Sequence, residues 1–325
     1  MITLGIESTA HTFGVGIVED GTILANVKSA YEPDEGGIHP RKASEHHYAN
    51  AKQTIDNAIS KADISEEDID LVAFSQGPGI PQCLQIGGTA ARSLSQKLGV
   101  PLVGVNHCIA HIEVGKLETG AEDPVTLYVS GGNSQIIAYA GGKYRIFGET
   151  LDIAIGNAID KFARSIDIPH PGGPRIEELA EKSENLVELP YVVKGMDFSF
   201  SGLVTRLQQM LGDYDEEDLC YSFQEYAFAM LVEATERAIA HLDKDEVLVT
   251  GGVAANKRLQ EMLEVMAKER GANSYKVPNE YAMDNGAMIA YTGQLKYNSK
   301  GETEINRSGI KPDWRTDQVE ADWNG

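Results

Sequence analysis

Two histidines, His107 and His111, stand four residues apart in the stretch VGVNHCIAHIEV of residues 103–114. Four residues are close to one turn of an α-helix, so a helix that begins after Asn106 would project both imidazole rings from one face. Two imidazoles on one helix face can share a metal ion. The simpler alternative is that one histidine caps or packs while the other is solvated, because such pairs also occur without a metal.

Three short turns rich in glycine or hydroxyl groups are candidates for holding phosphate. They are Ser8-Thr9, followed by His11, then Ser130-Gly131-Gly132-Asn133, and Gly251-Gly252. Glycine lets backbone N–H groups approach a phosphate closely. Hairpins and helix starts also need glycine, so a single turn is weak evidence. Because the three turns fall at equivalent places in a repeat, we expect a bound nucleotide, with Ser8, Thr9 and His11 as candidates in the first turn.

The segments that position these residues repeat one α/β plan. The opening 30 residues predict three antiparallel strands, and from residue 125 a strand, a Gly-rich turn, a strand, a Gly-Gly turn and a third strand match them. Buried-strand runs and helices follow in each half. We therefore expect an α/β protein of two duplicated lobes, 1–122 and 123–296. The polar segment 297–325 lacks periodicity and is expected to be a tail or a wrapping segment that joins the first lobe.

Composition narrows the class of protein. The 325 residues are too many for one ordinary core, and 49 acidic against 28 basic residues give a net charge of −21. Such a surface repels nucleic acid unless a basic patch or partner intervenes, although it can equally serve solubility. Three distant cysteines without metal or redox spacing indicate reduced thiols. With neither a leader nor an apolar run near ~20 residues, we expect a cytoplasmic protein without a membrane partner.

Eight strings occur in order over nearly the whole chain: GIESTAHT, NHCIAH, YVSGGNSQ, GNAIDKFAR, PHPGGPRIEELA, FSFSGL, TGGVAANKRL and MDNGAMIAY. Together they resemble the universal tRNA threonylcarbamoyladenosine synthase family, and STAHTFG resembles its archaeal and eukaryotic branch, the catalytic subunit of the KEOPS complex. The resemblance implies two ribonuclease-H-like lobes of the actin, heat-shock-70 and sugar-kinase (ASKHA) architecture. This fold agrees with the duplication in the sequence.

The resemblance also implies an activity: transfer of a threonylcarbamoyl group from threonylcarbamoyl adenylate to the adenine on the 3′ side of the anticodon, in tRNAs that read codons beginning with A. It implies one iron or zinc ion held by His107, His111 and Asp284, with Tyr128 as a further ligand. It implies an adenylate-type nucleotide or ATP in the interlobe cleft, at Tyr128, Val129, Ser130, Gly131, Gly132, Asn133, Asp160, Gly173, Glu177 and Asn256.

Elementary chemistry supports this set and also offers local alternatives. Two imidazoles and a carboxylate leave coordination positions open, as a Lewis acid needs. The donor is already activated as a mixed anhydride, so no serine or cysteine nucleophile is required. Asp284 could instead be the N-cap of the helix that follows it, and Asn256 a cap as well. Asp160 could be an exposed helix charge, and Glu177 a carboxylate favoured by the helix dipole.

Basic residues that could follow an RNA backbone form two groups: Arg41 and Lys42, and, in the closing part of the chain, Lys296, Lys300, Arg307, Lys311 and Arg315. A solvated tail is the alternative for the second group. We expect a modest phosphate track. The resemblance implies KEOPS-type subunits, including a small atypical kinase or ATPase and a dimerising small subunit, and these would supply most of the affinity for tRNA.

Two other classes of function compete with this one. A metalloprotease would explain the histidine pair, but HCIAH lacks the glutamate of an H-E-x-x-H helix. A nucleotide-dependent scaffold or ATPase of the same fold would explain the two lobes without using His107. Phosphoryl transfer is less favoured, because Glu7 stands where kinases of this fold generally carry an aspartate.

Overall fold

The computed structural model describes residues 1–32 and 37–324, which divide into two compact units. Unit 1 comprises Met1–Glu118, Ala140–Tyr144 and Met283–Gly325, and unit 2 comprises Thr119–Tyr139 and Arg145–Ala282. Each unit contains one five-stranded sheet. Among the described residues, no helix is long and apolar enough to cross a membrane.

The sheet of unit 1 has the order β3-β2-β1-β4-β5. Its strands are β1 (Ile2–Glu7), β2 (Thr12–Glu19), β3 (Thr22–Ala30), β4 (Leu71–Gly77) and β5 (Leu102–Asn106). The first three are mutually antiparallel, as expected, while β4 and β5 run parallel to β1. Every residue of β4 and β5 is buried, which is typical of parallel strands covered on both faces.

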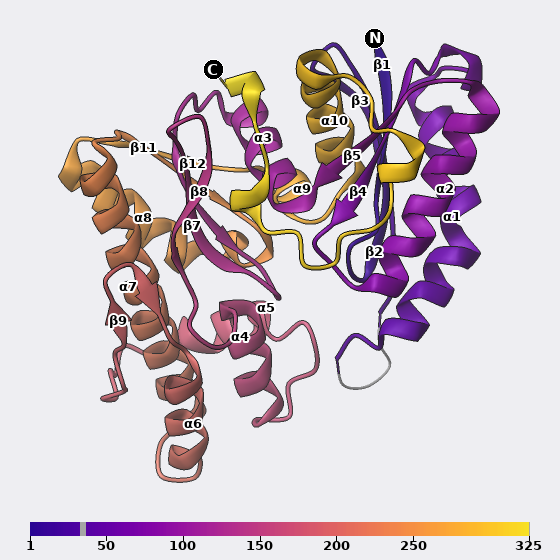
Figure 1. The fold of residues 1–325 in the computed structure, drawn as a ribbon. Helices are drawn as coiled ribbons and strands as arrows, with labels where there is room; N and C mark the ends of the chain where they lie inside the picture. The colour runs from indigo at the N-terminus through magenta and orange to yellow at the C-terminus, as the bar shows by residue number, and fades with distance from the viewer. Residues whose placement is uncertain (33–36, 325) are drawn as a thin grey trace. The chain divides into compact units, whose positions relative to one another are not determined.

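Helices cover both faces of this sheet (Figure 1). Helices α1 (Pro40–Ala62) and α2 (Pro81–Leu98) lie side by side against it, with the short turn η1 (Glu66–Asp68) between them in sequence. Helix α10 (Gly286–Lys300) lies on the other face, directly on β1 and β2. Glycines permit this approach: a Cβ built on Gly16 would lie 2.1 Å from the backbone nitrogen of Ala287. Larger residues on these strands would push α10 away from the sheet.

The unit boundaries differ from the expected ones in three places, the first being a shift of the first boundary from residue 122 to Glu118. The second lobe was expected to extend to residue 296, but α10 belongs to unit 1, together with the chain that follows it. The reason is the glycine contact between α10 and the first sheet, which joins segments almost 300 residues apart in sequence. The short stretch Ala140–Tyr144 also belongs to unit 1, where the Tyr144 hydroxyl donates to Glu113 over 2.7 Å.

The sheet of unit 2 repeats this layout, with the order β12-β11-β6-β7-β8. Its strands are β6 (Val125–Val129), β7 (Ser134–Ala140), β8 (Lys143–Glu149), β11 (Glu246–Thr250) and β12 (Asn273–Lys276). In the first sheet, β4 and β5 run parallel to β1, the first of three successive strands. In the second sheet, β11 and β12 run parallel to β6 in the same way. The predicted duplication is therefore confirmed.

The other elements of unit 2 surround a large apolar core. They are α4 (Ile155–Arg164), α5 (Gly173–Ala180), the two-residue strands β9 (Val193–Lys194) and β10 (Asp197–Phe198), α6 (Ser201–Met210), α7 (Glu216–Leu242), the turn η2 (Gly252–Ala255), α8 (Lys257–Arg270) and α9 (Asn279–Ala282).

The closing segment, residues 301–324, wraps unit 1 and is not a free tail. It contains three single-turn helices, η3 (Ile305–Arg307), η4 (Thr316–Gln318) and η5 (Asp322–Asn324). The carboxamide of Gln76 donates to the carbonyl oxygens of Arg307 and Gly309 over 2.8 and 2.7 Å. Near its end, the Trp323 indole donates to Glu113 over 2.7 Å. Polar contacts of this kind fix a segment that has no hydrophobic periodicity.

Candidate active site

Two imidazoles and one carboxylate converge in unit 1. Helix α3 (His107–Thr119) starts immediately after β5, so His107 is its first residue and His111 lies one turn further along. Asp284 lies just before α10, and its Oδ1 is 3.4 Å from Nε2 of His107 and 3.3 Å from Nε2 of His111. Among the described residues, these three form the only group of His, Cys, Asp or Glu side chains that could hold a metal ion, with ligand atoms within 4.8 Å of one another.

An asparagine precedes each of the two helices α3 and α10 and caps it. The side chains of the histidines and of Asp284 are therefore not needed as caps. Asn106 caps α3, because its Oδ1 accepts from the backbone N–H groups of Cys108 and Ile109 over 3.0 and 3.2 Å. Asn285 caps α10 by accepting from Met288 over 2.9 Å. The alternative that Asp284 is the N-cap is therefore wrong. The carboxylate of Asp284 is directed to the histidines because its neighbour performs the capping.

The donor set suits iron or zinc. Two ligand atoms about 2.1 Å from one ion, at the tetrahedral angle, lie about 3.4 Å apart, which matches both separations from Asp284. Two histidines with one carboxylate occur in catalytic zinc sites and in non-haem iron sites, and they leave coordination positions open. Both imidazoles are buried, whereas Asp284 is 19% exposed. The residues present therefore fit such an ion.

Glu7 holds the ring of His107 from the side opposite Asp284. Its Oε2 lies 3.0 Å from Nδ1 of His107, while its Oε1 accepts from the amide and hydroxyl of Thr9 over 2.6 and 2.5 Å. A carboxylate on Nδ1–H fixes the tautomer that leaves Nε2 able to bind a metal. This role of Glu7 was not predicted from the sequence, where Glu7 stood out only as a departure from kinases, although its place at the end of β1 was a usable signal.

The turn at Ser8 and Thr9 differs from the expected phosphate turn. The amide of Ser8 donates to Ser75 Oγ over 2.9 Å, and the donors of Thr9 are bound to Glu7. Neither amide is left to receive a phosphate, and the buried charge of Glu7 would repel one. His11, the third candidate of this turn, is half-buried.

The charges of this group reinforce one another. Burial lowers the pKa of His107, but Glu7 and Asp284 outweigh it and raise that pKa to about 9. Burial raises the pKa of Asp284, yet His107 and His111 together hold it well below its usual range. Glu7 and Asp284 thus favour a positive charge on the imidazole between them, and the same field would favour a divalent cation.

The glycine turn of unit 2 leaves open space. Ser130 and Asn133 close it, since the amide of Ser130 donates to the Asn133 carbonyl over 2.8 Å and the Asn133 amide to Ser130 Oγ over 3.1 Å. A Cβ on Gly131 or Gly132 would meet nothing within 4 Å. On its inner side, Gly156 at the start of α4 donates to the Ser130 carbonyl over 3.2 Å. The turn therefore lies at the carboxyl end of β6 with an exposed outer face.

Other expected nucleotide residues of unit 2 have structural contacts. Asn256 caps α8 by accepting from Leu259 over 3.1 Å, and Glu177 accepts from the amide of Lys257 over 2.7 Å. Both thus meet at the start of α8. Asp160 is not an exposed helix charge, because its oxygens accept from His170 and from the amide of Gly172 over 2.9 and 2.8 Å.

That carboxylate fixes the turn before Gly173, where a Cβ would meet nothing within 4 Å. Tyr128 and Val129 are buried on β6. Because Tyr128 belongs to unit 2 and the three metal-ligand candidates to unit 1, its role as a ligand stays a prediction.

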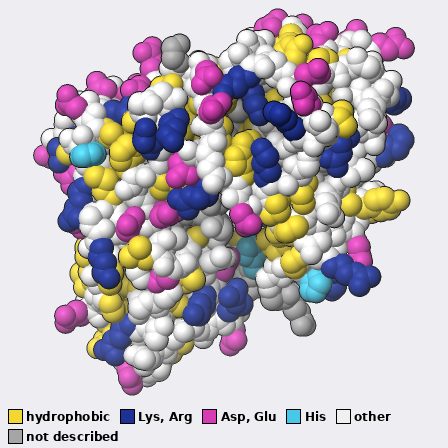
Figure 2. All heavy atoms as spheres, viewed as in Figure 1, with side chains coloured by type: hydrophobic (Ala, Val, Ile, Leu, Met, Phe, Trp, Pro, Cys, Tyr) yellow, Lys and Arg dark blue, Asp and Glu magenta, His cyan; other side chains and the backbone are white. Residues whose placement is uncertain are grey.

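The expected RNA-contacting residues separate into two places. Arg41 and Lys42 are exposed on α1, where Arg41 pairs with Glu45 over 2.9 Å. Four of the closing residues, Lys296, Lys300, Arg307 and Lys311, line one pocket, while Arg315 pairs with Asp317 over 3.4 Å. Figure 2 shows lysine and arginine side chains gathered over α10 and the closing segment, with carboxylates among them.

Comparison with known proteins identifies the family. A family model described as TsaD, tRNA N6-adenosine threonylcarbamoyltransferase, matches residues 22–291. The tRNA N6-adenosine threonylcarbamoyltransferase of Archaeoglobus fulgidus is 56% identical over 325 residues, covering 100% of both chains. The chain belongs to the tRNA N6-adenosine threonylcarbamoyltransferase family. It is therefore a transferase, as the resemblance predicted.

The chain is also similar to one longer relative and to solved structures that share its fold. The probable bifunctional tRNA threonylcarbamoyladenosine biosynthesis protein of Methanocaldococcus jannaschii is 54% identical over 99% of this chain and 60% of its own length. Among solved structures, T. kodakarensis HypF matches 94% of this chain and 49% of its own with a TM-score of 0.69 at 14% identity. A ROK hexokinase from Thermus thermophilus matches 92% and 100% with a TM-score of 0.56 at 15% identity. These matches confirm the ASKHA fold.

Proposed function

We propose that this chain transfers the threonylcarbamoyl group of threonylcarbamoyl adenylate to N6 of the adenosine on the 3′ side of the anticodon, in tRNAs reading codons that begin with A. The proposal is supported by the full-length similarity to threonylcarbamoyltransferases. The single structural observation that carries it is the contact of Asp284 with both His107 and His111, which assembles an open donor set.

The metal site of this proposal consists of His107, His111 and Asp284, holding iron or zinc. When bound, the ion supplies a Lewis acid that polarises an oxygen of the donor. The residues themselves have separate tasks. Glu7 holds the Nδ1 proton of His107, so that Nε2 can bind the ion in exchange for its own proton, and burial of both imidazoles excludes water from their side of the site.

The bound nucleotide, either the donor adenylate or ATP, is assigned to unit 2. The open outer face of Ser130-Gly131-Gly132-Asn133 suits a phosphate, because nothing of the protein occupies the space above the two glycines. Glu177 and Asn256, which meet at the start of α8, are assigned to the nucleoside. Asp160 acts indirectly by fixing the turn before Gly173.

Partner proteins of the KEOPS type complete the proposal. The net charge of −21 opposes RNA binding by the chain alone, so a small atypical kinase or ATPase and a dimerising small subunit would supply most of the affinity for tRNA. The bifunctional name of the Methanocaldococcus jannaschii relative, which is much longer than this chain, is consistent with a second activity that works alongside the transferase. A cytoplasmic location is part of this proposal.

The decisive experiment combines the chain and its partners with tRNA, threonine, bicarbonate, ATP and an adenylate-forming enzyme, and analyses the digested nucleosides by mass spectrometry. We expect one mass addition on adenosine, lost with a chelator and lost in His111→Ala and Asp284→Ala. His241→Ala, an exposed histidine at the end of α7, is the matched control. Full modification by His111→Ala would favour the non-catalytic scaffold, and peptide cleavage without RNA modification would favour the protease.

A further inference from the structure

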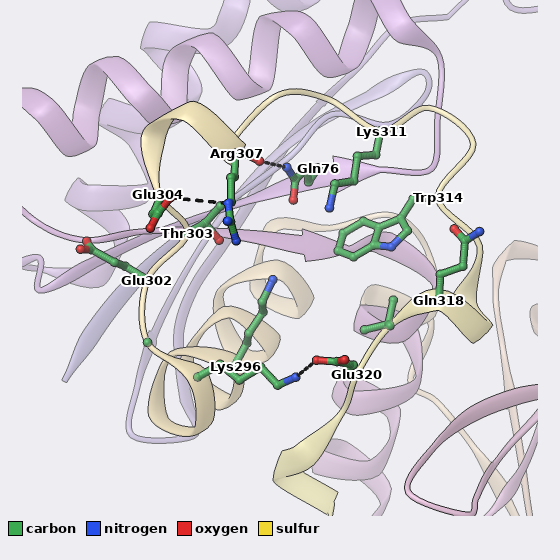
Figure 3. Close-up of a pocket in the computed structure, with 13 residues that line it drawn as sticks. Gln76, Lys296, Glu302, Thr303, Glu304, Arg307, Lys311, Trp314, Gln318 and Glu320 are labelled. Atoms are coloured by element: carbon green, nitrogen blue, oxygen red, sulfur yellow. Dashed lines mark hydrogen bonds and ion pairs between the residues drawn. The ribbon is translucent and has the colours of Figure 1, made fainter.

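A pocket of about 420 Å³ lies within unit 1, between the end of α10 and the closing segment (Figure 3). The side chains that matter here are those of Gln76, Lys296, Lys300, Arg307, Lys311 and Trp314. Its volume is within the range of pockets that hold small organic ligands. The metal-ligand candidates do not line it.

The four cations of the pocket are not equivalent. Lys300 is neutralised by Glu320 and Asp322, and Arg307 by Glu304 at 3.5 Å. Lys296 and Lys311 have no carboxylate partner among the described residues. Lys296 Nζ donates to the carbonyl of Gly104 over 2.7 Å, and burial together with the charges of Lys311 and Lys300 lowers its pKa to about 8. The ammonium groups of Lys296 and Lys311 repel each other, and an anion bound between them would relieve that repulsion.

Both of these ammonium groups lie over the indole ring of Trp314. Lys311 Nζ is 4.2 Å and Lys296 Nζ is 5.7 Å from the ring centroid. Figure 3 shows Lys296 pointing from α10 toward the ring and Lys311 next to it. An aromatic ring combined with cations is the combination that binds single-stranded nucleic acid, because every base can stack and every phosphate is charged.

Hydrogen bonds to backbone atoms anchor the segment that carries Lys311 and Trp314. One of their partners, Asn106, also positions the candidate metal ligands. The Trp314 carbonyl accepts from Asn106 Nδ2 over 3.0 Å, and the amide of Lys311 donates to the carbonyl of Gln76 over 2.7 Å. Asn106 is also the N-cap of α3, the helix that carries His107 and His111. A strand of RNA held at Trp314 is therefore held on the same piece of structure that positions the imidazoles.

We propose that this pocket binds one nucleotide unit of the RNA substrate, with its phosphate between Lys296 and Lys311 and its base against Trp314. The proposal rests on the proposed function, which makes RNA the substrate. A free mononucleotide offers the same chemistry, so the test separates the two sources.

The kinetic test compares KM for tRNA with kcat in the reconstituted reaction. Trp314→Ala should raise KM about 5- to 100-fold with little change in kcat, and Trp314→Phe should recover most of the loss, because a phenyl ring still stacks. Lys311→Gln, at an exposed position, should weaken binding and reduce the slope of log affinity against log salt by about 0.7 to 0.9. The matched control Lys52→Gln removes an exposed charge of α1 and should leave both unchanged.

Tryptophan fluorescence distinguishes RNA binding by Trp314 from a purely structural role, because only direct contact with a base would quench its emission. The chain has two tryptophans, and tRNA should quench the emission that is lost on Trp314→Phe, because a stacked base quenches indole. AMP is the free-nucleotide probe. The proposal is overturned if Lys311→Gln and Trp314→Ala keep the wild-type KM for tRNA, or if AMP alone quenches Trp314 and tRNA does not. Failure of the proposed function would look different, because the wild-type protein would then modify no tRNA.

Discussion

Replacing Glu7 by glutamine should reverse the proton position on His107. In the wild-type protein Oε1 of Glu7 accepts from both donors of Thr9, at 2.6 and 2.5 Å, and Oε2 faces Nδ1 of His107 at 3.0 Å. An amide nitrogen cannot accept, so the oxygen of the glutamine must stay with Thr9. Its NH₂ group then donates to Nδ1, and the imidazole proton moves to Nε2, the atom 3.4 Å from Asp284.

A protonated Nε2 cannot bind a metal, so one of three protein ligands is compromised. Changes to carboxylates that orient metal-bound histidines typically cost 10- to 100-fold in metal affinity, or about 1.4 to 2.8 kcal/mol. Since Glu7 is completely buried and no water competes for its place, we expect the upper half of this range. Modification activity should fall together with metal occupancy.

The assay is a competition titration of zinc, and of ferrous iron without oxygen, against a chromogenic chelator near neutral pH. Glu113→Gln is the matched control, since it also removes a buried carboxylate of unit 1, but one whose donors are Tyr144, Trp323 and Asn324. Its metal affinity should stay within about twofold of the wild-type value. Wild-type affinity in a folded Glu7→Gln protein, or an equal loss in Glu113→Gln, would show that Glu7 does not orient His107.

Three further predictions concern stability. Burial lowers the pKa of His47 to about 4, so this neutral histidine contributes stability that is present above pH 6.5 and lost as the pH falls toward 4, by up to about 3 kcal/mol; His47→Leu should flatten that part of the stability curve in urea titrations, and an unchanged curve would contradict this. Gly16→Ala should lower the free energy of unfolding by more than about 2 kcal/mol, because the added Cβ would meet the nitrogen of Ala287 at 2.1 Å; calorimetry would disprove this if the melting temperature were unaffected. Asn285→Ala removes the cap on Met288 and should cost about 1 kcal/mol, while a neutral result would mean that α10 needs no cap.

The sequence was sufficient wherever a feature depends on neighbouring residues. The spacing of His107 and His111 placed both rings on one helix face, and Asn106 made the start of that helix certain through a local cap. The repeated order of strands, turns and helices was readable for the same reason, since strand and helix periodicity are properties of short windows. The ordered strings GIESTAHT to MDNGAMIAY were enough to predict the family.

Sequence patterns were ambiguous where one residue type serves two roles. Asp284 was expected as a metal ligand or as a cap, and only the position of Asn285 decided between them. Ser8 and Thr9 had the composition of a phosphate turn, but the amide of Ser8 is bound to Ser75, and both donors of Thr9 are bound to Glu7. A hydroxyl or amide donor satisfies whichever acceptor lies nearest in space, and the sequence does not specify that acceptor.

Contacts between distant segments were decided by the tertiary structure alone. Asp284 reaches His111 across 173 residues because Gly16 and its neighbours let α10 lie directly on the first sheet. Trp314 meets Lys296 because a segment without periodicity is fixed by side chains such as Asn106 and Gln76. Local windows encode the helices and strands, whereas close packing, which depends on the shape of both partners, determines which of them meet.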